Sequence, residues 1–269
     1  MLLDYQPEHL GIDAAALHSA QPGGRFVLLP GSPARARAIA EHFDDRVVYP
    51  SARGHDVFTG RLCRNGQCLD LATVATGMGC PSVDIIVSEL IGLGARRLLR
   101  VGTAGSLQPQ RVKAGHLVLA TGAVRDEGTS IHYAPLELPA IASWQLVQAA
   151  QRAVARLPDL PPVHLGLVHT KDSLYAREFG AGPRADEHRR YRDQLAALGV
   201  LASEMEAAHL FILAQSYGAT AGEAIWAGCI LGIVGDQTPF GAADQRARTE
   251  AAAIALSLET ALEAGASQR

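Results

Sequence analysis

Residues 25–34 read Arg-Phe-Val-Leu-Leu-Pro-Gly-Ser-Pro-Ala, an apolar run that ends in a turn and leads into a helical pattern. Arg25 to Pro30 predicts a buried strand, Pro30 to Pro33 a tight turn, and Ala34 to Phe43 a helix. A helix that begins directly after a strand exposes its first backbone N–H groups, and these favour a bound anion. This stretch therefore predicts one strand–turn–helix unit of an α/β fold.

The rest of the chain alternates strand and helix patterns in the same way. Further apolar runs predict strands at Val47 to Tyr49, Cys68 to Thr76, Arg97 to Val101, His116 to Thr121, Val163 to Thr170 and Ala224 to Val234. Helical patterns occupy Ser82 to Leu93, Ala140 to Leu157, Ser203 to Tyr217 and Asp244 to Ala264. This alternation predicts a mostly parallel or mixed sheet covered by helices. The segment Gly180 to Arg192, rich in glycine and charge, is expected to be a mobile loop.

Length and composition indicate one globular domain over residues 1–269. With 48% hydrophobic and 19% charged residues and a net charge of -3, the chain resembles ordinary soluble proteins and predicts no nucleic-acid partner. Apolar stretches such as Ala224 to Val234 are shorter than the roughly 20 residues that span a bilayer, so no membrane role is expected. The cysteines lack metal-ligand spacing and Met1 to Gln21 lacks a targeting pattern, which predicts a reduced, cytoplasmic protein without a metal site.

Glycine-containing turns follow four of the predicted strands. They are Gly31, Gly77-Met78-Gly79, Gly102-Thr103-Ala104-Gly105 and Gly235-Asp236. In open α/β sheets ligands bind at the carboxyl ends of strands, so these turns are expected to converge on one pocket. For any single turn the alternative is that glycine only permits a tight bend.

Two of these turns carry hydrogen-bond donors suited to phosphate. Ser32 and Arg35 stand at the first predicted helix start, and Arg100 and Thr103 stand at a strand end and in the turn that follows. Neither set contains a competing acidic residue, and arginine binds phosphate in a bidentate manner. Neither set matches the P-loop or the GxGxxG spacing, so ATP and NAD are poorly supported.

Two carboxylates surround a thioether in Glu204-Met205-Glu206, which is expected to begin an apolar helix. A carboxylate there can accept hydrogen bonds from ribose hydroxyls while Met205 packs on the sugar. Two residues one position apart cannot point the same way in a helix, so Glu206 is predicted to bind the sugar and Glu204 to support it. The alternative is that both only favour the positive end of the helix dipole.

Together these motifs resemble the nucleoside phosphorylases related to uridine phosphorylase and the hexameric purine nucleoside phosphorylases. The resemblance covers nearly the whole chain. It rests on Pro30-Gly31-x-Pro33-x-Arg35, Thr76-Gly77-Met78-Gly79-x-Pro81-Ser82, Leu99-Arg100-Val101-Gly102-Thr103-x-Gly105 and Glu204-Met205-Glu206. The segments His9-Leu10-Gly11 and His132-Tyr133-Ala134-Pro135-Leu136-Glu137 are more similar to the uridine branch. The resemblance implies a central mixed, partly barrel-like sheet flanked by helices.

The resemblance also implies roles for single residues. Phosphate would be bound by Gly31, Ser32, Arg35, Arg100 and Thr103, and by Arg53 from a neighbouring subunit. Ribose would be held by Glu204, Met205, Glu206 and the neighbour's His9. Ser32 departs from the aspartate that is common in the family's phosphate turn. Sharing residues in this way implies a dimer as the minimal active unit and a hexamer, a trimer of dimers, as the assembly. Phosphate is the co-substrate, and neither cofactor nor metal is implied.

The base site departs from the uridine branch. Leu174 stands where that branch has an aromatic residue, and Arg177 is the remaining candidate to bind the base. Asp236 resembles the purine branch, in which a carboxylic acid can protonate a ring nitrogen of the leaving base. The alternative for Asp236 is a plain Asx turn. The motifs that are similar to the uridine branch thus favour a pyrimidine nucleoside as substrate, whereas Asp236 favours a purine nucleoside.

The predicted reaction is phosphorolysis of the N-glycosidic bond of uridine or a related pyrimidine nucleoside, giving base and (deoxy)ribose 1-phosphate. Bond cleavage builds positive charge on the sugar and negative charge on the base, so Arg100, Glu206 and Asp236 are the expected catalytic residues. A purine nucleoside phosphorylase is the first alternative. A nucleosidase, which would use water and need no cluster of Arg35, Arg53 and Arg100, is another, as is a non-catalytic nucleoside-binding protein.

Overall fold

The strand β1 (Phe26–Pro30) lies inside the sheet, and all five of its residues are buried. It pairs in parallel with β4 (Gln67–Val74) on one side and β5 (Arg97–Ser106) on the other. Strands buried on both faces read as continuous apolar runs, which is why the sequence revealed this one. The computed structural model describes residues 7–64, 66–238 and 240–266, so the predicted domain limits 1 and 269 lie outside the described residues.

The sheet is mixed and closes on itself along part of its width. Its strand order is β10-β6-β8-β9-β5-β1-β4-β3-β2, and β10 also pairs with β5. The additional strands are β2 (Asp44–Tyr49), β3 (Val57–Arg64), β6 (Leu117–Asp126), β7 (Ala140–Ile141), β8 (Val163–Lys171), β9 (Ala202–Glu204) and β10 (Trp226–Gly235). Strands β5, β9, β8, β6 and β10 thus form a closed ring, and the predicted partly barrel-like α/β domain is confirmed.

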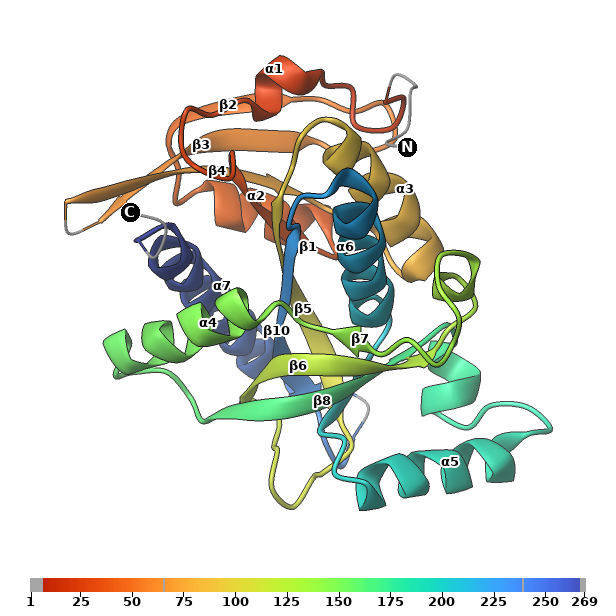
Figure 1. Cartoon of the computed structure of the whole chain (residues 1–269). Coiled ribbons are helices and arrows are strands. Elements are labelled where there is room, and N and C mark those ends of the chain that lie inside the picture. The colour runs from red at the N-terminus through yellow and green to blue at the C-terminus, as the bar shows by residue number, and fades with distance from the viewer. Residues whose placement is uncertain (1–6, 65, 239, 267–269) are drawn as a thin grey trace.

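Helices flank this sheet (Figure 1). They are α1 (Ala14–Leu17), α2 (Pro33–Ala40), α3 (Cys80–Gly92), α4 (Trp144–Arg156), α5 (Ala185–Ala197), α6 (Ala207–Ala221) and α7 (Ala243–Ala266), with the short helical turns η1 (Ser130–His132) and η2 (Leu174–Glu178). Helix α3 packs beside α6 and helix α4 beside α7, and α7 also contacts β10 (Figure 1). None of the helices in the described ranges is both long and apolar enough to cross a membrane.

All seven predicted strands are present, but the pattern missed β3, β7 and β9. In β3, Gly60 interrupts the run of apolar residues that would have revealed the strand. Glycine is needed there because the chain packs tightly, and a Cβ at this position would lie 2.8 Å from the Cβ of Phe43. The predicted mobile loop Gly180 to Arg192 was wrong, since α5 begins at Ala185. Only Leu195 of α5 is buried, so this helix lacks the apolar periodicity that would have identified it.

Two further predictions were wrong. The helix expected from Ser203 begins at Ala207, because Ala202–Glu204 form strand β9, which pairs with β5 and β8. The cysteines are not all reduced, because Cys63 and Cys68 face each other across the β3–β4 hairpin and form a disulfide. Two residues so close in sequence become directly opposite only through the strand pairing. Cys80 and Cys229 are free and buried.

Candidate active site

A cavity of about 730 Å³ opens at the carboxyl ends of β1, β5 and β10. The predicted convergence of the four turns is confirmed, since Gly31, Gly77, Gly105 and Gly235 all line it. The second of these turns depends on glycine, because Gly77 has a φ of +79° and a Cβ there would collide with Oγ of Ser82. Parts of the chain that are distant in sequence therefore form one ligand-sized site.

The start of α2 forms one wall of this cavity. Ser32 is the N-cap residue, and its Oγ accepts a hydrogen bond from the backbone N–H of Arg35. Thr103 lines the cavity from the end of β5. Free N–H groups at a helix start, together with nearby hydroxyl groups, suit an oxyanion. Ser32 and Thr103, both predicted to bind phosphate, thus share one site.

Arg35 also lines the cavity, but a carboxylate already engages it. Its Nε lies 3.2 Å from Oε2 of Glu250 and its Nη2 lies 3.1 Å from Oε1, while Nη1 donates to the carbonyl oxygen of Val101. Glu250 belongs to α7 and was not recognised in the sequence. Nothing local could have revealed it, because the two side chains are 215 residues apart.

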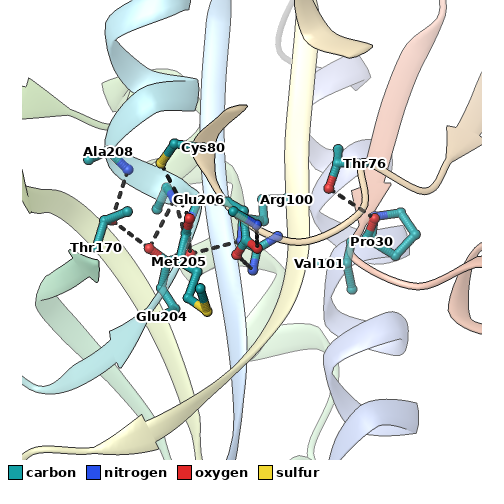
Figure 2. Close-up of polar contacts among 12 residues, drawn as sticks. Pro30, Thr76, Cys80, Arg100, Val101, Thr170, Glu204, Met205, Glu206 and Ala208 are labelled. Atoms are coloured by element: carbon teal, nitrogen blue, oxygen red, sulfur yellow. Dashed lines mark hydrogen bonds and ion pairs between the residues drawn. The ribbon is translucent and has the colours of Figure 1, made fainter. Parts of the chain in front are cut away.

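Arg100 occupies the centre of a buried charge cluster (Figure 2). Its Nε lies 3.0 Å from Oε2 of Glu204, and its Nη2 is paired with Glu206. Burial opposes the charge of Arg100, but the two carboxylates outweigh it and hold the guanidinium pKa above its ordinary value. Among the described residues, the buried Nη1 has no hydrogen-bond partner. This guanidinium therefore remains charged and retains a free donor.

The two glutamates point to the same arginine, contrary to the prediction. Glu204 is on a strand and Glu206 precedes the helix, so the helical geometry that would separate them does not apply. Both carboxylate oxygens of Glu204 accept hydrogen bonds. Besides its contact with Arg100, Glu204 accepts from the hydroxyl of Thr170 and from the backbone N–H groups of Glu206 and Ala207 (Figure 2). Glu206 accepts from the N–H of Gly79, 2.7 Å away, and burial raises the pKa of its carboxyl group.

The other end of the cavity differs from what the sequence suggested. Leu174 lines it, as does Met205, but Arg177 is not among the lining residues. Arg177 binds both carboxylate oxygens of Asp126 at 2.6 Å and stacks on Tyr191. The charged residues that do line this end are Lys171, Glu178, Arg192 and Asp193. The sequence contained one sign that Lys171 could have a special role, since it is one of only two lysines in the chain.

Two aromatic residues that the sequence patterns did not single out also line the cavity. Phe179 and Phe240 meet edge to face, with ring centroids 5.9 Å apart. They come from the end of η2 and from the segment before α7, so they are distant in sequence. Aromatic walls provide the flat apolar surface that a planar ligand requires. Phe179 and Phe240 are therefore candidates for the aromatic contact that the uridine branch makes at the position of Leu174.

Asp236 lines the cavity as an ionised carboxylate. It accepts hydrogen bonds from the backbone N–H groups of Ala114, 3.0 Å away, and of Gln237. These bonds hold the pKa of its carboxyl group below the usual range. A carboxylate with a lowered pKa is a poor proton donor near neutral pH. An Asx turn would use the backbone N–H two residues on, whereas these bonds come from the next residue and from Ala114, so both the Asx turn and the catalytic role stay predictions.

His9 and Arg53 do not line this cavity. The Nδ1 of His9 lies 2.6 Å from Oε1 of Glu89, and its carbonyl oxygen accepts from the hydroxyl of Ser51. The same hydroxyl accepts from the backbone N–H of Arg53, so both predicted residues belong to one local unit. His9 lines a second cavity of about 410 Å³ instead. Within one chain, neither residue is part of the main cavity's lining.

Comparison with known proteins agrees with this geometry. The model of the family described as "Phosphorylase superfamily" matches residues 25–261. The chain is 37% identical to the uridine phosphorylase of Treponema pallidum over 86% of this chain and 82% of that protein. It is 31% identical to that of Haemophilus influenzae over 94% and 97%. It is 32% identical to the guanosine phosphorylase of Halorubrum lacusprofundi over 80% and 79%. With a family match that includes every strand and the whole cavity, the chain belongs to the phosphorylase superfamily.

Proposed function

We propose that this protein catalyses the phosphorolysis of nucleosides, with uridine as the principal substrate, to give uracil and ribose 1-phosphate. One observation carries the proposal: the buried guanidinium of Arg100 lines the cavity and is in contact with Glu206, the residue expected to hold the ribose. In this proposal the phosphate and the ribose therefore bind next to each other. The relatives named uridine phosphorylase support the choice of uridine.

In this reaction a phosphate oxygen forms a bond to C1′ of the ribose as the bond from C1′ to the base breaks. The electron pair of the broken bond leaves with the base. Arg100, the N–H groups at the start of α2 and the hydroxyl of Thr103 would hold the phosphate. Glu206 would accept hydrogen bonds from the ribose hydroxyls. Phosphate is the co-substrate, and the proposal requires no cofactor.

A purine substrate remains the alternative. It is supported by the relative named guanosine phosphorylase and by the carboxylate of Asp236 in the cavity. A nucleosidase is less well supported, because water as a nucleophile would not require two arginines, Arg35 and Arg100, in the lining of one cavity. Substrate tests with and without phosphate distinguish all three reactions.

The active unit in this proposal is a dimer, and the complete assembly is a hexamer built as a trimer of dimers. The support is that His9 and Arg53 lie together, outside the cavity of their own subunit. A mixture of Arg53→Ala and Arg100→Lys subunits would test it. Recovery of activity that neither variant has alone is the expected result, and no recovery would contradict a shared site. A cytoplasmic location is also proposed; the free Cys80 and Cys229 support it, whereas the Cys63–Cys68 disulfide does not.

The decisive experiment measures base release from uridine, thymidine, inosine, guanosine and adenosine, each with and without inorganic phosphate. The expected result is release of uracil only with phosphate, together with stoichiometric ribose 1-phosphate. Release without phosphate would identify a nucleosidase. Release from inosine or guanosine alone would identify a purine phosphorylase, and tight binding without turnover would identify a binding protein.

A further inference from the structure

Lys171 is a buried cation at the end of β8 that has no part in holding the phosphate or the ribose. It is only 2% exposed and lines the cavity. Its Nζ donates to Oγ of Ser203 at 2.7 Å and lies 3.0 Å from Oε2 of Glu178. A buried ammonium group is costly unless it is paired or used. The pair that Lys171 and Glu178 form is therefore a candidate part of the ligand site.

The pair lies beside Gly105 of β5. In the sheet Gly105 is directly opposite Ser203, and Ser203 is directly opposite His169. A Cβ at Gly105 would lie 3.4 Å from Oε1 of Glu178. Arg100 lies earlier on the same strand as Gly105. The anion site and the Lys171–Glu178 pair therefore line different parts of one cavity.

A chain of hydrogen bonds orients the ammonium group of Lys171. Because an ammonium can only donate, the Ser203 hydroxyl that accepts from it is free to donate to Nδ1 of His169, 3.0 Å away. The other ring nitrogen of His169, 2.8 Å from Oδ2 of Asp126, then carries the proton. The only other hydrogen bond of Lys171 to the described residues is a long one, 3.5 Å, to the carbonyl oxygen of Glu204. A better acceptor in the cavity would replace that contact.

The carboxylate of Glu178 can also accept further hydrogen bonds. Among the residues that the structure describes, its buried Oε2 makes no hydrogen bond, although it is paired in charge with Lys171. Arg192 donates to the backbone carbonyl of Glu178, and its guanidinium is 3.9 Å from Oε1. The cavity thus contains a fixed donor and a fixed acceptor side by side.

We propose that Lys171 and Glu178 bind the carbonyl oxygen and the adjacent ring N–H of the leaving base. This inference rests on the proposed phosphorolysis. When the bond to C1′ breaks, its electron pair moves into the base ring and onto the carbonyl oxygen, and Lys171 stabilises that oxygen by a hydrogen bond without transferring a proton. The pair selects uracil, thymine, hypoxanthine and guanine. It rejects cytosine and adenine, which present an amino group beside a bare ring nitrogen.

The first test compares uridine with 5-fluorouridine, whose base is a better leaving group, at saturating phosphate. Removing one donor to a developing oxyanion costs about 100-fold or more in rate. Lys171→Met is expected to lose about that factor on uridine. The loss on 5-fluorouridine is expected to be clearly smaller, since that base needs less stabilisation. Equal losses on both substrates would overturn the proposal, because a purely structural lysine would not distinguish them.

The second test uses 3-methyluridine, which lacks the ring N–H. The wild-type protein is expected to prefer uridine strongly, and Glu178→Met is expected to lose most of that preference. An unchanged preference would contradict the role of Glu178. If Lys171→Met does not fold, as judged by circular dichroism, this second test decides.

The double variant Lys171→Met/Glu178→Met separates base binding from a structural ion pair. It leaves no unpaired buried charge, so a structural pair would allow the uridine rate to return toward the wild-type value. Base binding predicts a rate as low as in Lys171→Met. Arg184→Met is the matched control, because Arg184 is exposed and paired only on the surface with Glu187. Absence of phosphate-dependent uracil release from the wild-type protein would instead refute the proposed function itself.

Discussion

Arg35 and Glu250 form an ion pair at the wall of the cavity that is proposed to bind phosphate, with Nη2 of the arginine 3.1 Å from Oε1 of the glutamate. A phosphate that enters the site must therefore share this guanidinium with a carboxylate or displace it. The Arg35 side chain is nearly buried, whereas that of Glu250 is 38% exposed, so the glutamate is the partner that can move away. This relationship predicts that Glu250 weakens phosphate binding.

Glu250→Gln is expected to lower the KM for phosphate by roughly fivefold, since exposed ion pairs are worth up to about 1 kcal/mol. The kcat for uridine is expected to remain within a factor of two or so, because Glu250 does not line the cavity. Initial rates at varied phosphate concentration measure both values. Glu187→Gln, a surface carboxylate paired with Arg184, is the control. A KM that is unchanged or higher would refute the competition.

Arg100→Lys retains the positive charge between Glu204 and Glu206. It replaces the planar guanidinium, which can donate two parallel hydrogen bonds, with a single ammonium group. The variant is expected to fold, because the two buried carboxylates remain partnered. The kcat/KM for phosphate is expected to fall by about 10- to 100-fold, since a lysine cannot make the bidentate contact. Steady-state kinetics, with thermal denaturation as the check on folding, measure this. Kinetics like those of the wild type would exclude Arg100 from the phosphate site.

Asp236→Asn is expected to change uridine turnover by less than about threefold. The lowered pKa of this carboxyl group comes from the backbone N–H groups of Ala114 and Gln237, and an asparagine oxygen can still accept a hydrogen bond. Turnover of uridine and inosine by the variant gives the result. A large loss confined to inosine would instead establish Asp236 as a proton donor to a purine base.

Stability is expected to fall in acid partly through Asp126. Burial raises the pKa of its carboxyl group, but hydrogen bonds from His169 and Arg177 outweigh burial and hold that pKa below the usual value. A lowered pKa stabilises the folded state above the unfolded-state pKa of about 3.9, and the effect is lost as pH falls through the folded-state value. Unfolding midpoints of Asp126→Asn should therefore differ most from wild type near neutral pH and converge in acid. A constant difference would contradict this.

Prediction from sequence succeeded where the signal was local. The run before Gly31, the four glycine turns and the Glu204–Glu206 motif were recognisable because each lies within a few consecutive residues. It failed for α5, whose residues are nearly all exposed, and for β9, which is too short to show a period. It also misjudged Arg177, because the position of a side chain in η2 depends on Asp126, which lies 51 residues away.

By itself the sequence determined the α/β class, the order of most elements and the turns that line the cavity, because apolar period and backbone freedom are local properties. Only the tertiary structure decided which charges meet. Arg35 reaches Glu250, Arg100 reaches Glu204 and Glu206, and the end of β8 brings Lys171 beside Ser203. These partners are 32 to 215 residues apart. The last two contacts form because β9 pairs with both β5 and β8, and the first forms between α2 and α7, so tertiary packing and not sequence spacing sets these distances.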